Sequence, residues 1–365
     1  MTDILRTWLI AALIHDELPP LAAAAWTELL AQAESEGVLV LLEHRLAGHP
    51  GNSDLPEALI REIQQAARYS LMNQLPFLSE QKTLFMTLNQ VCKPFLVMKG
   101  AALGHWLYAS PALRPVTDID LWFADKSAVL SLDEILRPLG YERAETEGGL
   151  SSFELAFDKR SNGKTIRIDA HWALFNSAIL SGCVSFEAAY SRAMSVSIQG
   201  QDVKALGLTD ALINSIGHRA LKHLVNQADS LKWLYDQYLL FNALDSVQWQ
   251  ELIARCAQAG ISDLALEAIG QSQQQFKTCI PPDVLDSLSK NVRHEKLKRS
   301  WFQSWARYQW HEMRAVSPKY SERAVWLGQR LWPNPEAMRE RYGSGDPAWR
   351  FMLKRIGIGL RRLFS

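Results

Sequence analysis

Cysteine is scarce in this chain of 365 residues, and its distribution excludes the usual cysteine-based structures. The four cysteines, Cys92, Cys183, Cys256 and Cys279, lie far apart and include no Cys-x-x-Cys pair. A disulfide framework or a zinc site would require closer and more regular spacing. We therefore expect free thiols in a reducing compartment and predict a cytoplasmic location.

Long apolar runs and an excess of one charge are also missing. No uncharged run approaches the ~20 residues that a helix needs to cross a bilayer. Residues 8–14 are apolar but lack a basic segment and a cleavage site, so we interpret them as part of a core helix and not as a signal peptide. Basic and acidic residues number 39 each, so the formal net charge is zero. Bulk electrostatics therefore gives no argument for a nucleic-acid partner.

What the chain does contain is enough apolar sequence for a packed core, with 48% apolar and 21% charged residues. Residues 1–90 have helical periodicity, and we expect their long helix, from about residue 56 to residue 89, to be interrupted near Pro76. Residues 91–205 mix strand and helix patterns, including a helix from about residue 126 to residue 139, and residues 206–365 return to helix. We predict an α+β protein in which a small mixed sheet is flanked by two helical regions.

Two aspartates mark the most informative stretch of the chain. Asp118 and Asp120 lie within the apolar run 118–123, and strand alternation places both side chains on one face. Two carboxylates this close repel each other, and burying them without a partner is costly. A divalent cation is the simplest compensation.

A strand that leads into Lys99-Gly100 is expected just upstream. Residues 95–98 are apolar, and a helical pattern begins near Ala101. A glycine between a strand and a helix allows backbone N–H groups to approach a phosphate. The Lys99 amine can supply a point charge to the same group.

A third carboxylate follows in a later strand. Residues 165–172 alternate, which places Asp169 and His171 on one face, and a hairpin turn is expected at residues 161–163. Three carboxylates are the minimal set for holding the metal ions of a phosphoryl or nucleotidyl transfer reaction.

These motifs resemble the nucleotidyltransferase superfamily typified by DNA polymerase β. Within it, they are most similar to a family described as uncharacterised nucleotidyltransferases. The resemblance covers roughly residues 90–200 and is carried by Met98-Lys99-Gly100, Arg114, Thr117-Asp118-Ile119-Asp120-Leu121 and Ile168-Asp169-x-His171-Trp172. It also implies that the strand with Asp169 lies beside the strand with Asp118 and Asp120.

The resemblance implies an enzyme that moves a nucleoside monophosphate from a nucleoside triphosphate to a hydroxyl-bearing acceptor. The acceptor would be a sugar, a sugar-phosphate or a peptide, and the cofactor would be Mg²⁺ or Mn²⁺. The expected residues are Asp118, Asp120 and Asp169 as metal ligands and catalytic groups, Lys99, Gly100, Arg114 and His171 at the nucleotide, and His218, Lys222 and Asp236 on the acceptor side.

Two other interpretations stay open at this stage. Asp118-x-Asp120 is also the kind of motif with which metal-dependent glycosyltransferases bind sugar nucleotides. Alternatively, the chain is a nucleotide-binding or partner module without activity, because Lys99-Gly100 replaces the Gly-Gly or Gly-Ser of the wider superfamily. The basic, apolar residues 349–365 could contact an anionic membrane surface or a protein, although we favour ordinary amphipathic packing.

Overall fold

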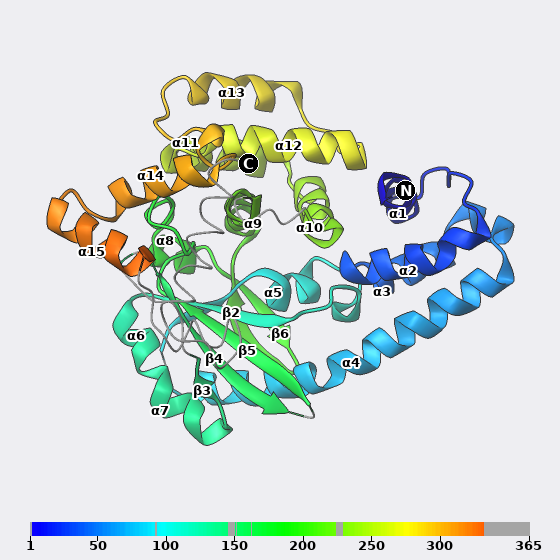
Figure 1. Cartoon of the computed structure of the whole chain (residues 1–365), viewed down its shortest axis with the longest axis horizontal. Coiled ribbons are helices and arrows are strands. Elements are labelled where there is room, and N and C mark those ends of the chain that lie inside the picture. Colours follow the sequence, from blue (N-terminus) through cyan, green and yellow to red (C-terminus); the bar gives the residue numbers. More distant parts are fainter. Residues whose placement is uncertain are drawn as a thin grey trace.

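The computed structural model describes residues 2–91, 93–144, 150, 152–161, 163–223 and 229–331, and it shows a mixed sheet with helices on both faces (Figure 1). The sheet has seven strands in the order β3-β4-β5-β2-β1-β7-β6. The strands are β1 (Phe95–Val97), β2 (Asp118–Phe123), β3 (Glu142–Arg143), β4 (Glu154–Ser161), β5 (Lys164–His171), β6 (Met194–Ile198) and β7 (Gln201–Ala205). The α+β prediction is confirmed.

The centre of the sheet combines parallel and antiparallel pairs. β2 pairs in parallel with β5 and antiparallel with β1, and β1 pairs in parallel with β7. The predicted hairpin joins β4 to β5, where Ser161 pairs with Lys164 and Gly163 has a φ of +77° that favours glycine. The parallel β2–β5 pair brings Asp118, Asp120 and Asp169 together.

The N-terminal region is helical, as predicted. Its α-helices are α1 (Thr2–Ile14), α2 (Trp26–Ser35), α3 (Leu39–Ala47) and α4 (Glu57–Gln90). The expected interruption near Pro76 is wrong, because α4 is one helix with Pro76 inside it. Buried side chains on both sides of the proline, including Ile63, Ala67, Phe77 and Leu84, fix the two halves of α4 and offset the lost hydrogen bond.

Three helices within the sheet region complete the core. They are α5 (Lys99–Trp106), α6 (Lys126–Leu130) and α7 (Leu132–Leu136). A single helix over residues 126–139 was expected, but the chain forms α6, α7 and a 3₁₀ turn over Arg137–Leu139. Ser131 lies between the two helices and donates its hydroxyl hydrogen to the carbonyl of Ala128, a local hydrogen bond that competes with regular helix.

The C-terminal region covers the face of the sheet opposite α4. Its helices are α9 (Leu208–His223), α10 (Leu231–Asn242), α11 (Ser246–Ala259), α12 (Ser262–Phe276), α13 (Pro282–Val292), α14 (Trp305–Val316) and α15 (Tyr320–Leu331), and α8 (Phe186–Ser191), which belongs to the sheet region between β5 and β6, lies on the same face. Leu96 and Trp122 from the sheet pack into the same hydrophobic cluster as Phe186, Ile213 and Phe241. None of the described helices combines the length and apolar character needed to cross a lipid bilayer.

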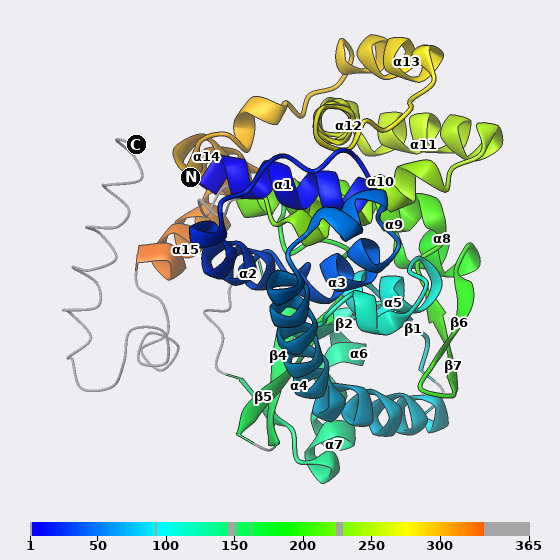
Figure 2. The ribbon, with the colours of Figure 1, turned by 90° about the vertical axis from the view of Figure 1, so that its right-hand side faces the viewer.

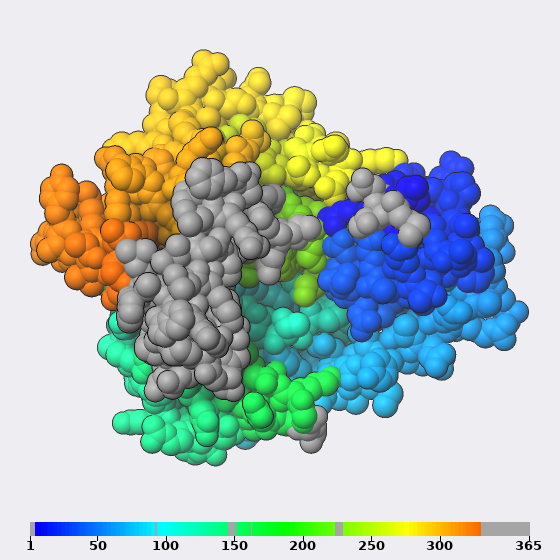
Figure 3. Space-filling model, viewed as in Figure 1, coloured from blue at the N-terminus to red at the C-terminus, as the bar shows by residue number. Residues whose placement is uncertain are grey.

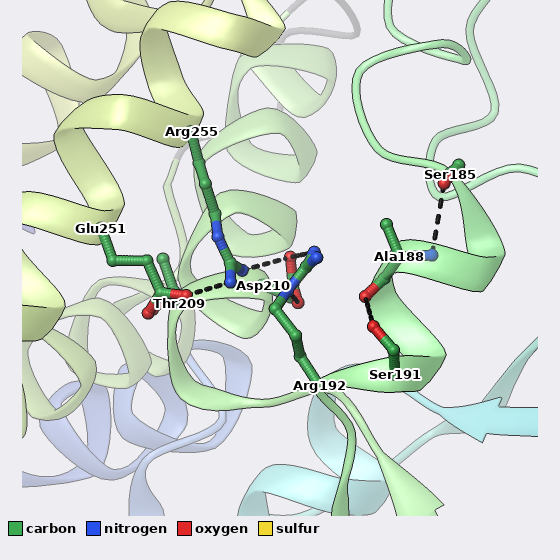
Figure 4. A network of polar contacts seen from close by, with 8 residues as sticks. All are labelled: Ser185, Ala188, Ser191, Arg192, Thr209, Asp210, Glu251 and Arg255. Carbon is green, nitrogen blue, oxygen red and sulfur yellow. Dashed lines mark hydrogen bonds and ion pairs between the residues drawn. The ribbon is translucent and has the colours of Figure 1, made fainter.

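A buried carboxylate anchors the start of α9. Asp210 is 1% exposed and accepts hydrogen bonds from the Arg192 guanidinium at 3.0 and 3.1 Å, while Arg255 Nη1 lies 2.9 Å from its Oδ1 (Figure 4). The neighbouring Thr209 hydroxyl donates to Glu251 at 2.9 Å. These contacts fix α9 against α11 and the end of α8.

The N- and C-terminal regions also contact each other directly. Leu231, Leu234 and Tyr235 of α10 pack into the hydrophobic cluster formed by α1, α2 and α3. The Ser230 hydroxyl donates to the carbonyl of Glu36 at 2.7 Å. Figure 2 shows α10 beside the N-terminal helices, and Figure 3 shows the blue and yellow surfaces adjoining where α1 contacts α12.

The predicted division into regions 1–90, 91–205 and 206–365 stays a prediction, and residues 349–365 lie outside the described residues.

Candidate active site

The site is built on two neighbouring parallel strands. Asp120 of β2 is the register partner of Asp169 of β5, and Asp118 is the partner of Arg167. Alternation directs Asp118, Asp120 and Asp169 to the face of the sheet that also carries Trp122 and the C-terminal helices. The structure therefore brings together all three aspartates of the predicted metal-binding set.

Asp120 is the carboxylate with the closest partners. Lys99 Nζ donates to Asp120 Oδ1 at 2.5 Å, and His171 Nε2 lies 3.2 Å from the same oxygen. The other ring nitrogen of His171 lies 3.3 Å from Glu154 Oε2, although its direction is not that of a hydrogen bond. The predicted site residues Lys99 and His171 thus both contact Asp120.

The three aspartates experience different electrostatic environments. Burial acts to raise the pKa of Asp120, but the Lys99 charge and the His171 hydrogen bond outweigh it and hold that pKa well below its usual range. Burial raises the pKa of Asp169 to about 7, and the charges of Asp120 and Glu154 add to this effect. Burial and the Asp120 charge also raise the pKa of Asp118. Asp118 and Asp169 therefore carry negative charge that is not fully compensated.

Lys99 reaches Asp120 from an unusual backbone conformation. Its φ is +50°, in the left-handed region that side-chain-bearing residues rarely adopt, and it is the first residue of α5. Burial acts to lower the pKa of the Lys99 ammonium, but the attraction of Asp120 raises it above its usual value. Lys99 is therefore cationic in this site.

Gly100 is required by its neighbours. A Cβ at this position would lie 2.9 Å from Arg114 Nη1 and 3.1 Å from Val116 Cγ1. The guanidinium cannot easily move away, because Asp236 holds it in place. The structure thus gives Gly100 a packing role, while its predicted approach to a phosphate stays a prediction.

Arg114 is held by a carboxylate from the C-terminal region. Its Nε donates to Asp236 Oδ1 at 2.8 Å and its Nη2 donates to Oδ2 at 2.7 Å, which is a bidentate arrangement. The Tyr108 hydroxyl donates to Asp236 Oδ1 at 2.6 Å, and Arg114 Nη1 donates to the carbonyl of Pro115 at 3.0 Å. Arg114 and Asp236 are 5% and 3% exposed, so the pair connects the loop before β2 to α10 inside the protein.

The predicted acceptor-side residues of α9 lie beside an aromatic ring. His218 packs edge-on against Trp233 with ring centroids 5.0 Å apart, and Lys222 Nζ lies 5.9 Å from the centre of the same ring. Burial lowers the pKa of His218 well below its usual value, and the charges of Lys99 and Lys222 lower it further. His218 is therefore neutral at neutral pH, and its helix α9 contacts α5, the helix that begins at Lys99.

Lys232 is a site residue that sequence reasoning did not identify. Burial lowers the pKa of its amine to about 8, and the charge of Arg114 lowers it further, while Asp236 and Asp118 act in the opposite direction. Its stem packs on Gly37, where an added Cβ would lie 2.9 Å from Lys232 Cδ. Lys232 precedes Asp236 by four residues, the spacing of an ion pair on a helix surface, but Asp236 binds Arg114 instead. The described residues offer the Lys232 amine no hydrogen-bond acceptor.

Glu154 was also missed by sequence reasoning. It lies on β4 as the register partner of His171, so its carboxylate reaches the site only through the sheet pairing. A glutamate at the start of an expected strand gave no local signal of this role. Glu154 is the last of four side chains in contact with one another, Lys99, Asp120, His171 and Glu154, in which basic and acidic residues alternate.

The donor atoms present suit a hard divalent cation. Carboxylate oxygens are the ligands that Mg²⁺ prefers, and burial together with the neighbouring Asp120 charge raises the pKa values of Asp118 and Asp169, an effect that a bound cation would oppose. Within the described part of the chain, no three acidic, histidine or cysteine side chains already surround one point, so binding requires side-chain rotation. The metal assignment stays a prediction.

Comparison with known proteins identifies a family for most of the chain. Residues 22–277, well over half of the chain, match the model of a family described as uncharacterised nucleotidyltransferase. A crystal structure of an antigenic nucleotidyltransferase-like protein from Paracoccidioides brasiliensis is similar over 56% of this chain and 93% of that chain, with 16% identity and a TM-score of 0.33. No curated protein matches the sequence. The family match covers both β2 and β5, and the chain therefore belongs to the family of uncharacterised nucleotidyltransferases.

Proposed function

We propose that this protein transfers a nucleoside monophosphate from a nucleoside triphosphate to a hydroxyl-bearing acceptor and releases pyrophosphate. The observation that carries the proposal is the pairing of Asp120 with Asp169 on adjacent parallel strands, with Asp118 on the same face. Nucleotidyl transfer depends mainly on positioning and on the neutralisation of phosphate charge. Family membership supports a nucleotide as the substrate.

Asp118, Asp120 and Asp169 are the residues that would hold Mg²⁺, or Mn²⁺ in its place. When bound there, a divalent ion supplies positive charge to the phosphate oxygens and favours ionisation of the acceptor hydroxyl. Asp120 is ionised at all relevant pH values, because Lys99 and His171 stabilise its charged form.

Asp169 is the proposed proton acceptor for the incoming hydroxyl. In the protein without metal, burial and the charges of Asp120 and Glu154 raise its pKa to about 7, so its carboxylate is more basic than that of Asp120. Its position opposite Asp120 places it beside the start of β2, where Asp118 and Asp120 lie.

Lys232 is the proposed contact for the phosphate groups of the nucleotide. It is a half-buried amine without a hydrogen-bond acceptor in the described residues, and it interacts electrostatically with Asp118. A phosphate oxygen would satisfy the amine and raise its pKa. In this proposal Arg114 acts as a positioning residue, because its donors already bind Asp236 and Pro115.

The surface of α9 and α10 is the proposed acceptor side. Trp233, which packs edge-on against His218 and has Lys222 Nζ 5.9 Å from its ring centre, offers an aromatic ring with a cation beside it. Such a surface suits a sugar, a sugar-phosphate or a polar peptide side chain. Asp236 contributes by holding Arg114.

A thermal-shift panel tests the proposal. The four nucleoside triphosphates and several sugar nucleotides are added to the protein with Mg²⁺ or with EDTA. A ligand that binds only the folded state at 100 times its Kd stabilises it by about 2.7 kcal/mol. We expect an Mg²⁺-dependent shift with at least one triphosphate, loss of that shift in Asp118→Asn, and pyrophosphate release with a suitable acceptor.

Other outcomes would favour the alternatives. A response to sugar nucleotides alone would support a metal-dependent glycosyltransferase. A response to triphosphates without pyrophosphate release, across a panel of sugar and peptide acceptors, would support a nucleotide-binding module. The Lys99–Asp120 ion pair is the observation that favours this binding module. The Lys99 amine already occupies one oxygen of the carboxylate that would hold the metal.

A further inference from the structure

Lys99 binds the central carboxylate of the site from a backbone position that disfavours lysine. Its φ of +50° is unstrained for glycine but disfavoured for residues with a Cβ. Its amine lies 2.5 Å from Asp120 Oδ1, and the side chains of Lys99 and Asp120 are 25% and 3% exposed. Position 99 thus has a lysine where the backbone favours glycine, and the lysine amine binds Asp120 inside the site.

The oxygen atoms of the three aspartates differ in what is bound to them. Asp120 Oδ1 receives both Lys99 Nζ and His171 Nε2, whereas the described residues give Oδ2 no donor. Asp118 Oδ1 accepts a long hydrogen bond of 3.3 Å from Thr117. The described residues provide no hydrogen bond or ion pair to the Asp169 carboxylate. One oxygen of the central carboxylate is therefore occupied by two partners, whereas the described residues give the other carboxylate oxygens one long hydrogen bond at most.

This distribution limits how many metal ions can bind. Two divalent ions about 4 Å apart need a carboxylate that bridges them, and Asp120 lies between Asp118 along β2 and Asp169 across the strands. Asp120 Oδ1 already faces an ammonium, which has three donors and no lone pair to offer a metal. A second ion at this oxygen would also be repelled by the Lys99 charge.

We infer that Lys99 is a resident cation in place of a second metal ion, so that the site binds one divalent ion through Asp118, Asp169 and the free oxygen of Asp120. This inference rests on the proposed function, because that function places the metal at the three aspartates. Lys99 then acts as a positioning residue that fixes Asp120 and sets the metal stoichiometry.

A Mn²⁺ titration followed by electron paramagnetic resonance of the free ion tests the inference without measuring activity. We expect one bound Mn²⁺ per wild-type chain and two per Lys99→Gly chain. Lys99→Gly removes the amine and also relieves the positive φ, so the variant is expected to fold. Asp169→Asn should weaken Mn²⁺ binding at least tenfold.

Lys277→Gly is the matched control. Lys277 also has a positive φ, of 56°, but ends α12 and is 68% exposed. This variant should bind one Mn²⁺, like the wild type. Two Mn²⁺ ions per wild-type chain, or one per Lys99→Gly chain, would overturn the inference while leaving the proposed function intact. Absence of both Mn²⁺ binding and triphosphate binding in the wild type would overturn the inference and the proposed function together.

Discussion

Asp120 and Asp169 face each other across the parallel strands β2 and β5, yet the protein shifts the pKa values of their carboxyl groups in opposite directions. Asp120 has Lys99 and His171 as partners, whereas Asp169 is buried beside the negative charges of Asp120 and Glu154. Substitution of the two aspartates should therefore have opposite effects on stability.

Asp169→Asn should stabilise the protein at neutral and alkaline pH. The folded-state pKa of Asp169, about 7, is above the unfolded value near 3.9, so its ionisation opposes folding increasingly as the pH rises from about 4 to 7. We expect a gain of about 1–3 kcal/mol at pH 8 that disappears near pH 4. Thermal unfolding of wild type and variant across this pH range measures the difference.

The control for this experiment is Asp202→Asn, at an exposed position in the β6–β7 hairpin. It should change the melting temperature little at any pH. A melting temperature of Asp169→Asn below that of the wild type at pH 8 would show that the Asp169 carboxylate is a structural hydrogen-bonding group.

Asp120→Asn should destabilise the protein, whereas Asp118→Asn should not. The amide at position 120 leaves the Lys99 ammonium without its anion and removes the carboxylate that contacts His171, which costs roughly 3 kcal/mol. Asp118 has a raised pKa and only a long contact with Thr117, so loss of its charge relieves repulsion. Chemical denaturation of the two variants gives the comparison.

A double variant separates charge from packing at this position. Asp120→Asn combined with Lys99→Gly should recover part of the lost stability, because the unpaired ammonium is gone. Equal stability losses for Asp118→Asn and Asp120→Asn would contradict the different environments described for the two carboxylates.

Arg114→Lys should lower the free energy of unfolding of the protein even when no ligand is present. A lysine cannot form both hydrogen bonds to Asp236 that the guanidinium makes from Nε and Nη2. We expect a loss of about 1–3 kcal/mol for Arg114→Lys and about 3–5 kcal/mol for Arg114→Ala or Asp236→Ala. A double-mutant cycle between positions 114 and 236 measures the coupling by chemical denaturation.

The same variants test the earlier expectation that Arg114 contacts the triphosphate. A weakened triphosphate Kd with unchanged stability would show that the guanidinium binds the ligand directly. Arg192→Lys provides a comparison, since Arg192 also makes a bidentate pair, with Asp210, on an element outside the site.

Lys232→Met should weaken triphosphate binding at least tenfold while stabilising the unliganded protein near pH 7. The pKa of the folded-state amine, about 8, lies below the unfolded value near 10.4, so folding is opposed wherever the amine is charged in the unfolded chain. The stability gain should vanish as the pH approaches 10.4. Isothermal titration calorimetry and thermal unfolding measure the two effects.

The pH dependence of binding adds a second criterion. Wild-type affinity should fall as the pH rises through about 8, because a free amine loses its charge there, and the affinity of Lys232→Met should not. Lys82→Met, at an exposed position of α4, should match the wild type in both measurements. Unchanged affinity in Lys232→Met would remove this residue from the nucleotide site.

Local patterns were sufficient to predict the part of the site that the sheet carries. Alternation within residues 118–123 and 165–172 and the turn at residues 161–163 placed three carboxylates on one face, as observed. The strand order that brings β5 beside β2 came from the family resemblance, since alternation does not select a neighbouring strand.

Longer-range contacts could not be predicted in the same way. The carboxylate that binds Arg114 lies 122 residues further along the chain, and no local pattern specifies such a contact. Lys232 was missed because its spacing to Asp236 suggested an ordinary helix-surface pair. The helix break predicted at Pro76 was wrong, because tertiary packing of α4 outweighs the low intrinsic helix propensity of proline.

The Arg114–Asp236 pair has a consequence for the order of events during protein synthesis. A ribosome that adds 5–20 residues per second needs about 6–24 s to produce the 122 residues that separate the two partners. By the end of that interval β1, β2 and β5 have all been made, but throughout it the Arg114 guanidinium lacks the Asp236 carboxylate that it binds in the finished protein. The contact between the loop before β2 and α10 can therefore form only after the strands that carry the three aspartates have been synthesised.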